Sequence, residues 1–161
     1  MTFRIERLST ENIGAMWRIN EEGLPGVGKV SEEALKDLLA LSELPLGVFD
    51  ETGLLGFVLC LLPGTRYGSL NYAWFNERYD DFLYVDRIAI GAAARNRSAG
   101  TALYQRVLAD AAERGWPVAA EVSLKPPNLG SERFHRRHGF VPVGVLHHLK
   151  QSVTMYLREP A

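Results

Sequence analysis

Two carboxylates lie inside otherwise apolar stretches of the sequence, where acidic side chains are uncommon. Asp86 stands within residues 82–90, and Glu121 stands within residues 118–122. Carboxylates set among apolar neighbours are frequent general bases, which take a proton from a reacting group. Asp86 and Glu121 are therefore candidate bases. The alternative is a buried structural ion pair, for Asp86 with the adjacent Arg87.

A loop of small and basic residues follows the 82–90 stretch and opens a predicted helix. Its sequence is Arg95-Asn96-Arg97-Ser98-Ala99-Gly100. The first N–H groups of a helix and its dipole together attract anions. The small residues allow a phosphate to approach the backbone, and Arg95 and Arg97 add positive charge. The pattern predicts a phosphate site, although a turn rich in small residues for packing alone has the same composition.

A second polar segment runs from Asn128 to Phe140. Asn128 or Ser131 can cap a short helix, and Gly139 is placed to end it in a left-handed conformation. Phe134 is expected to pack inward from this helix. His135, beside it, is a candidate proton donor because the ordinary pKa of histidine is about 6.5.

The elements that position these segments alternate between strands and helices. The patterns predict strands at 3–8, 46–49, 54–62, 82–90 and 118–122, a final pair within 141–157, and helices at 10–22, 31–39, 100–114 and 131–138. Residues 63–81 are predicted to form a long polar and aromatic connection. This order indicates an α/β (α+β) fold with a mixed sheet and helices on both faces. Residues 1–161 are predicted to form a single domain, because no linker composition interrupts them.

Charge and hydropathy argue against several classes of partner. The net charge is −1 over 161 residues, so the chain lacks the basic excess that a nucleic acid partner requires. The longest apolar run, residues 54–63, is too short to cross a bilayer, and the N-terminus lacks the apolar core of a signal peptide. No membrane association and a cytoplasmic location are the resulting expectations.

Together, the two polar segments resemble the GCN5-related N-acetyltransferase (GNAT) superfamily. Arg95-x-x-Ser98-x-Gly100 is similar to its pyrophosphate motif, Gln/Arg-x-x-Gly-x-Gly/Ala, and Asn128-x-x-Ser131-x-x-Phe134-His135-x-x-x-Gly139-Phe140 is similar to its second cofactor motif. The resemblance implies a three-layer fold with a mostly antiparallel, twisted sheet of about seven strands and helices on both faces. It also implies a V-shaped splay between the 82–90 and 118–122 strands.

The resemblance implies acetyl-CoA as co-substrate and no metal. The residues carried over as cofactor-binding are Ile88, Ala89, Ile90, Arg95, Asn96, Arg97, Ser98, Ala99, Gly100, Thr101, Asn128, Ser131 and Phe134. Ser98 stands where the family usually has glycine. His135 stands where many members have the tyrosine that protonates the departing thiolate. The candidate catalytic residues are then His135, Glu121 and Asp86, with a histidine that only lines the cofactor wall as the alternative for His135.

The implied reaction is acetyl transfer from acetyl-CoA to a primary amine, by direct attack with help from a general base. The alternative is a non-catalytic CoA-binding sensor or interaction module of the same fold. Tyr72, Trp74 and Asp81 are candidate contacts for a small-molecule or peptide amine, because aromatic rings and carboxylates suit a cation. Aromatics that cover a sheet edge or form a dimer contact are the competing interpretation, and the edge strand of the final hairpin would allow a homodimer.

Overall fold

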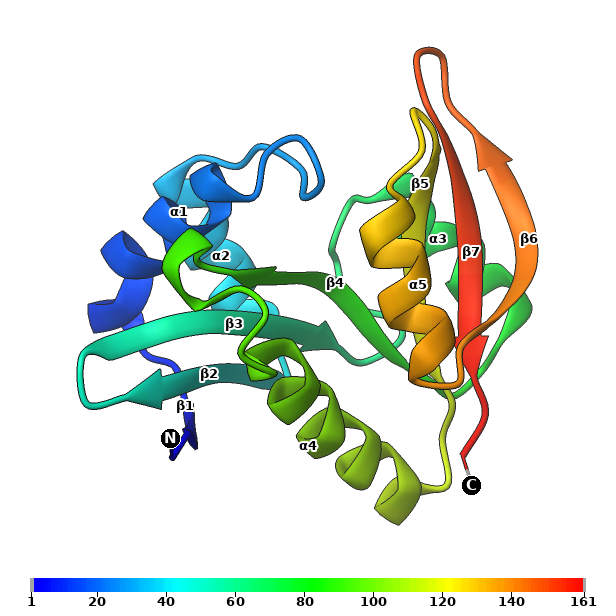
Figure 1. Ribbon diagram of the computed structural model, residues 1–161. Helices are drawn as coiled ribbons and strands as arrows, with labels where there is room; N and C mark the ends of the chain where they lie inside the picture. The colour runs from blue at the N-terminus through cyan, green and yellow to red at the C-terminus, as the bar shows by residue number, and fades with distance from the viewer. Residues whose placement is uncertain (1, 161) are drawn as a thin grey trace. The chain divides into compact units, whose positions relative to one another are not determined.

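The computed structural model describes residues 2–160, and Figure 1 labels their helices and strands along the chain. These residues divide into two compact units. The first unit comprises residues 2–61 and 85–107, and the second comprises residues 62–84 and 108–160. Strand β4 (Leu83–Ile90) and helix α4 (Ala99–Arg114) each continue from one unit into the other. The strands follow the order β1-β2-β3-β4-β5-β7-β6.

The first unit is built on an antiparallel meander. Strand β1 (Arg4–Arg7) pairs with β2 (Leu44–Asp50), which pairs with β3 (Gly53–Leu61). Helices α1 (Ile13–Glu22) and α2 (Glu32–Leu41) pack against each other and against β3. The N-cap predicted for α2 is confirmed, because the Ser31 hydroxyl accepts a hydrogen bond from the N–H of Ala34 at 3.1 Å. Met16, Leu35, Phe57 and Leu103 form part of the buried core.

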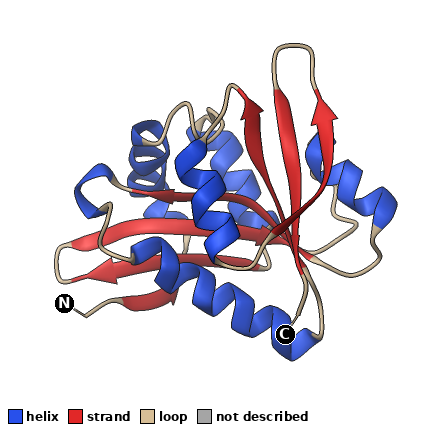
Figure 2. Ribbon diagram, turned by 45° about the vertical axis from the view of Figure 1, so that its right-hand side comes forward, coloured by secondary structure: helices blue, strands red, loops and turns tan. Residues whose placement is uncertain are grey.

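The second unit contains strands β5 (Val118–Lys125), β7 (Ser152–Arg158) and β6 (Val141–His147), side by side and antiparallel (Figure 2). The start of β4 joins β5 in a parallel ladder, in which Leu83 pairs with Val118 and Tyr84 with Ala119. The sheet is therefore mixed and mostly antiparallel, as expected. The V-shaped splay beyond these pairs stays a prediction.

Helices cover both faces of the sheet in the second unit. On one face, the ring of His135, from α5 (Leu129–Arg137), stacks on Tyr156 of β7. On the other face, the Trp74 side chain, from α3 (Leu70–Arg78), lies where a Cβ on Gly144 would point. Gly144 pairs with Met155, whose side chain points away from that of Tyr156, because neighbouring residues of a strand alternate between faces.

Helix α3 corrects the prediction of an irregular connection over residues 63–81. The Ser69 hydroxyl caps the helix by accepting a hydrogen bond from the N–H of Tyr72 at 3.2 Å. Tyr72 and Phe75 are buried, and their rings join those of Phe82 and Tyr84 with centroid separations of 5.1–6.4 Å. The cap at Ser69 and the three-residue spacing of the buried rings are the signals that could have found this helix.

Candidate active site

In the first unit, the predicted phosphate loop forms a tight turn that leads into α4. Asn96 and Ser98 both have φ of 63°, in the left-handed region that favours glycine, and α4 begins at Ala99. This conformation explains why glycine suits the position of Ser98, because the left-handed backbone costs a residue with a Cβ about 1–2 kcal/mol. The turn leaves the first N–H groups of a 16-residue helix directed out of its N-terminal end. The backbone at 95–101 therefore suits a phosphate.

The two arginines of this turn contact other parts of the first unit. Arg95 donates to the carbonyl oxygen of Glu22 at 2.8 Å and to that of Ile90 at 3.4 Å. Arg97 forms an ion pair with Asp50, with 3.1 Å between Nη2 and Oδ2. Hydrogen bonds from the hydroxyl and N–H of Thr52, together with Arg97, hold the pKa of Asp50 below its ordinary value. Both arginines thus brace the turn, and their contact with a phosphate stays a prediction.

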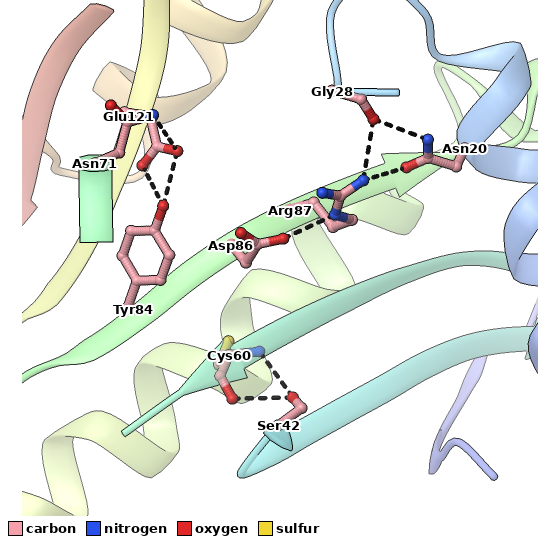
Figure 3. A network of polar contacts seen from close by, with 9 residues as sticks. All are labelled: Asn20, Gly28, Ser42, Cys60, Asn71, Tyr84, Asp86, Arg87 and Glu121. Carbon is pink, nitrogen blue, oxygen red and sulfur yellow. Dashed lines mark hydrogen bonds and ion pairs between the residues drawn. The ribbon is translucent and has the colours of Figure 1, made fainter. Parts of the chain in front are cut away.

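Asp86 has the ion-pair partner that the structural alternative requires. Its Oδ2 lies 2.8 Å from Nε of Arg87, and its side chain is 4% exposed. Arg87 also donates to the side-chain oxygen of Asn20 and to the carbonyl oxygen of Gly28, each at 3.0 Å (Figure 3). The amide of Asn20 donates to the same Gly28 oxygen. Asp86 is therefore part of a network that fastens the loop after α1 to β4.

The 128–140 segment of the second unit forms the short helix that the sequence predicts. Asn128 is the residue that caps it, because its side-chain oxygen accepts from the N–H of Ser131 at 3.2 Å. Gly139 follows the helix with φ of 89°, the expected left-handed stop. The ring of Phe134 packs edge-on against His135 and His138.

His135 is a buried, neutral histidine. Its Nδ1 lies 2.8 Å from the carbonyl oxygen of Ser131, and a carbonyl only accepts, so Nδ1 carries the proton. Burial lowers the pKa of His135 to about 4, even though the bond to Ser131 raises it. At neutral pH the imidazole therefore lacks the extra proton that an acid needs. This environment favours the structural interpretation of His135 over the proton-donor role.

Glu121 lies in a polar cluster within the second unit. Glu121 is partly buried, and its carboxylate accepts from the hydroxyl of Tyr84, at 2.8 Å to Oε1 and 2.9 Å to Oε2. The side-chain amide of Asn71 donates to Oε1 at 3.2 Å (Figure 3). Glu121 faces α3 because it pairs with Met155, on the same face of the sheet as Trp74. The sequence did not predict Tyr84 or Asn71 as partners of Glu121. Strand register and the docking of α3 bring them to Glu121, and neither can be seen in a local sequence pattern.

The candidate acceptor residues differ in their surroundings. Tyr72 is 1% exposed, and its hydroxyl contacts Leu62 and Thr65 of its own chain. Trp74 packs against Gly144 on one side and lies under the guanidinium of Arg78, 4.0 Å from the ring centroid. Asp81 is exposed. Trp74 thus lies against β6, the last strand of the sheet, and the roles of Tyr72, Trp74 and Asp81 toward an acceptor stay predictions.

The residues described hold no group of three or more histidine, cysteine or acidic side chains suited to a metal ion. Within the same residues, the helices lack the length and apolar character that a membrane span requires.

The family comparison decides the class of this protein. The model of the acetyltransferase (GNAT) family matches residues 16–140. The chain belongs to this family. The GNAT acetyltransferase is therefore an enzyme that transfers an acetyl group from acetyl-CoA to an amine. Binding of the pyrophosphate by the turn at 95–101 stays a prediction. No curated protein sequence matches the chain.

Solved structures show the same fold at low sequence identity. Ard1 from Thermoplasma volcanium superposes with a TM-score of 0.79 at 17% identity, covering 100% of this chain and 99% of the other. The ribosomal-protein-S18-alanine N-acetyltransferase from Escherichia coli has a TM-score of 0.78 at 13% identity, covering 99% and 95%. NAA60 from Arabidopsis thaliana, in complex with acetyl-CoA, has a TM-score of 0.77 at 15% identity, covering 98% and 99%. The GNAT acetyltransferase thus has the GNAT fold over nearly its whole length.

Proposed function

We propose that this GNAT acetyltransferase acetylates a primary amine and that Glu121 is its general base. The observation that carries the proposal is the partly buried Glu121, whose carboxylate is held by donors from Tyr84 and Asn71. A carboxylate that accepts hydrogen bonds from such donors is held in one orientation, as a base that meets an ammonium group requires. Asp86 suits the role less well, because Arg87 is paired with it and its side chain is almost fully buried.

In the proposed reaction, Glu121 takes a proton from the ammonium group of the acceptor. The neutral nitrogen then attacks the thioester carbonyl of acetyl-CoA, so that an N–C bond forms and the C–S bond breaks. The nitrogen loses its second proton to solvent and becomes the amide of the product. CoA leaves as the thiolate and takes a proton from solvent, because His135 is neutral at the working pH. The roles of Ile88, Ala89 and Ile90 toward the donor remain part of this proposal.

The acceptor is a primary amine of a small molecule or a peptide. The Escherichia coli neighbour is named for an alanine of a ribosomal protein, and another neighbour is described as a phosphinothricin N-acetyltransferase, at 19% identity and a TM-score of 0.73. Peptide and small-molecule amines therefore both belong in the test.

A homodimer stays a prediction. The terminal position of β6 in the sheet and the exposed Val141, Val143 and Val145 support it. The cytoplasmic location also stays a prediction.

The test measures CoA release with acetyl-CoA and a panel of peptides and small amines. For an accepted amine, Glu121→Gln should lower kcat by about 10²-fold or more, the contribution of a positioned base. Glu121→Gln should bind acetyl-CoA with the wild-type Kd when the binding is measured by calorimetry. Wild-type kcat in Glu121→Gln would remove Glu121 as the base. Binding of acetyl-CoA without acetylation of any amine in the panel would overturn the proposed acceptor class.

A further inference from the structure

A line of polar side chains extends from Glu121 to the connection between β6 and β7, all within the second unit. Nε2 of His148 lies 2.8 Å from the side-chain oxygen of Asn71, and the Asn71 amide nitrogen lies 3.2 Å from Oε1 of Glu121. Tyr84 contacts the same carboxylate from β4 (Figure 3). Glu121 thus meets Tyr84 and Asn71 directly and is linked to His148 through Asn71, although Asn71 and His148 are 77 positions apart in the chain.

The chemistry of the groups determines the direction of each hydrogen bond. An ionised carboxylate only accepts, so the atom of Asn71 that faces Glu121 must be its NH₂ group. The oxygen of the same amide then faces His148, and Nε2 of His148 must donate a proton to it. A reversed amide would place its oxygen against the carboxylate and two donors against each other. The carboxylate of Glu121 therefore fixes the orientation of the Asn71 amide, and His148 binds the opposite end of that amide.

The packing of α3 holds Asn71 in this place. Asn71 lies in the first turn of α3, directly after the Ser69 cap. The same helix packs its Trp74 against Gly144 of β6, the strand that leads to His148. Helix α3 thus packs against β6, and the connection that carries His148 follows β6 directly in the chain.

We propose that Asn71 and His148 are positioning residues for the general base. Asn71 holds the carboxylate of Glu121 in its ionised form and in one orientation, and His148 holds Asn71. The inference rests on the proposed role of Glu121. The titratable groups that face this cluster are Tyr84 from β4 and His148 from the β6–β7 connection, while β7 places the apolar Met155 opposite Glu121.

The test compares Asn71→Leu and His148→Phe with a matched control, His147→Phe. A hydrogen bond to a charged group contributes about 1.5–3 kcal/mol, so Asn71→Leu should lower kcat about tenfold or more. Loss of a donor to the ionised carboxylate should also move the acidic limb of the kcat/KM pH profile to higher pH. His148→Phe should act in the same direction, and the double variant should be no worse than Asn71→Leu.

The control and a conservative variant separate positioning from folding. His147 bonds the hydroxyl of Ser152 at 2.8 Å, so His147→Phe should leave both kcat and the pH profile unchanged. His148→Gln keeps an N–H donor and should restore most of the activity that His148→Phe loses. If Asn71→Leu fails to fold, the two His148 variants and the His147 control decide the question.

Two failures are distinguishable. Wild-type pH profiles in both Asn71→Leu and His148→Phe, with kcat lost in Glu121→Gln, would overturn the positioning role and leave the base in place. Wild-type kcat in Glu121→Gln would overturn the base, and the positioning role would fall with it.

Discussion

His135 shows how burial determines the chemistry of a single residue. Its ring is 3% exposed and packs against Phe140 and Tyr156, with Nδ1 bonded to the carbonyl oxygen of Ser131. Water is excluded from the ring, so the charged form is disfavoured and the pKa falls to about 4. The sequence suggests a proton donor at His135, whereas the structure places a neutral imidazole there.

The same burial predicts a loss of stability in mild acid. The unfolded chain binds the proton at the ordinary pKa of 6.5, whereas the folded chain binds it only near pH 4. The contribution of His135 to the free energy of unfolding is therefore fully present above pH 6.5 and declines as the pH falls toward 4, by roughly 3 kcal/mol in total. Urea unfolding at a series of pH values measures this decline.

The variant His135→Phe should flatten that pH dependence. A smaller slope would remain, because burial and the nearby Arg137 also lower the pKa of His138. If wild type and His135→Phe lost stability equally between pH 6.5 and 4, His135 would not be the group that binds the proton.

Helix α3 and strand β6 are joined at a point that tolerates no added atom. A Cβ on Gly144 would lie 2.5 Å from Cζ2 of Trp74, closer than real contacts allow. The guanidinium of Arg78 also lies over the Trp74 ring, so the indole has a second neighbour besides Gly144. This contact is the element-scale reason that Asn71 and His148 stay within reach of each other.

Gly144→Ala should therefore destabilise the second unit. Overpacking of this kind costs about 1–3 kcal/mol, measured by urea unfolding. Gly68→Ala is the matched control, because a Cβ at Gly68 meets nothing within 4 Å. Trp74→Leu should reduce the additional cost of Gly144→Ala, since the indole atoms that clash are removed. Equal stability of Gly144→Ala and Gly68→Ala would contradict this packing.

At the scale of the whole molecule, β4 and α4 each continue through both units. Neither unit can unfold alone without breaking these two elements. A single cooperative transition is the expected result of a thermal melt, and it would support the prediction that residues 1–161 form one domain.

Acetyl-CoA should raise the midpoint of that melt. A ligand at about 100 times its Kd adds about 2.7 kcal/mol, which corresponds to a Tm increase of roughly 5–10 °C for a chain of this size. Free CoA should also raise the Tm. ATP is the control that tests for general phosphate binding, and it should leave the Tm unchanged. No shift with any CoA species would show that the turn at 95–101 does not hold the donor.

The sequence alone determined the features that depend on neighbouring residues. The cap at Ser31, the stop at Gly139 and the small-residue turn before α4 each involve only a few consecutive positions. For α5 the sequence offered Asn128 or Ser131, and the structure shows that Asn128 is the cap. Local backbone geometry sets such features, so residue type and spacing reveal them. The two motifs and the order of elements were sufficient for the family.

The tertiary structure alone decided the partners of Glu121 and the burial of His135. Glu121 meets Tyr84 and Asn71 across 37 and 50 positions of the chain, and strand register with Met155 decides which face it occupies. Burial, which makes His135 neutral, also arises only when distant elements pack around the ring. Long-range contacts have no local signature, because they depend on register and docking rather than on neighbouring residues.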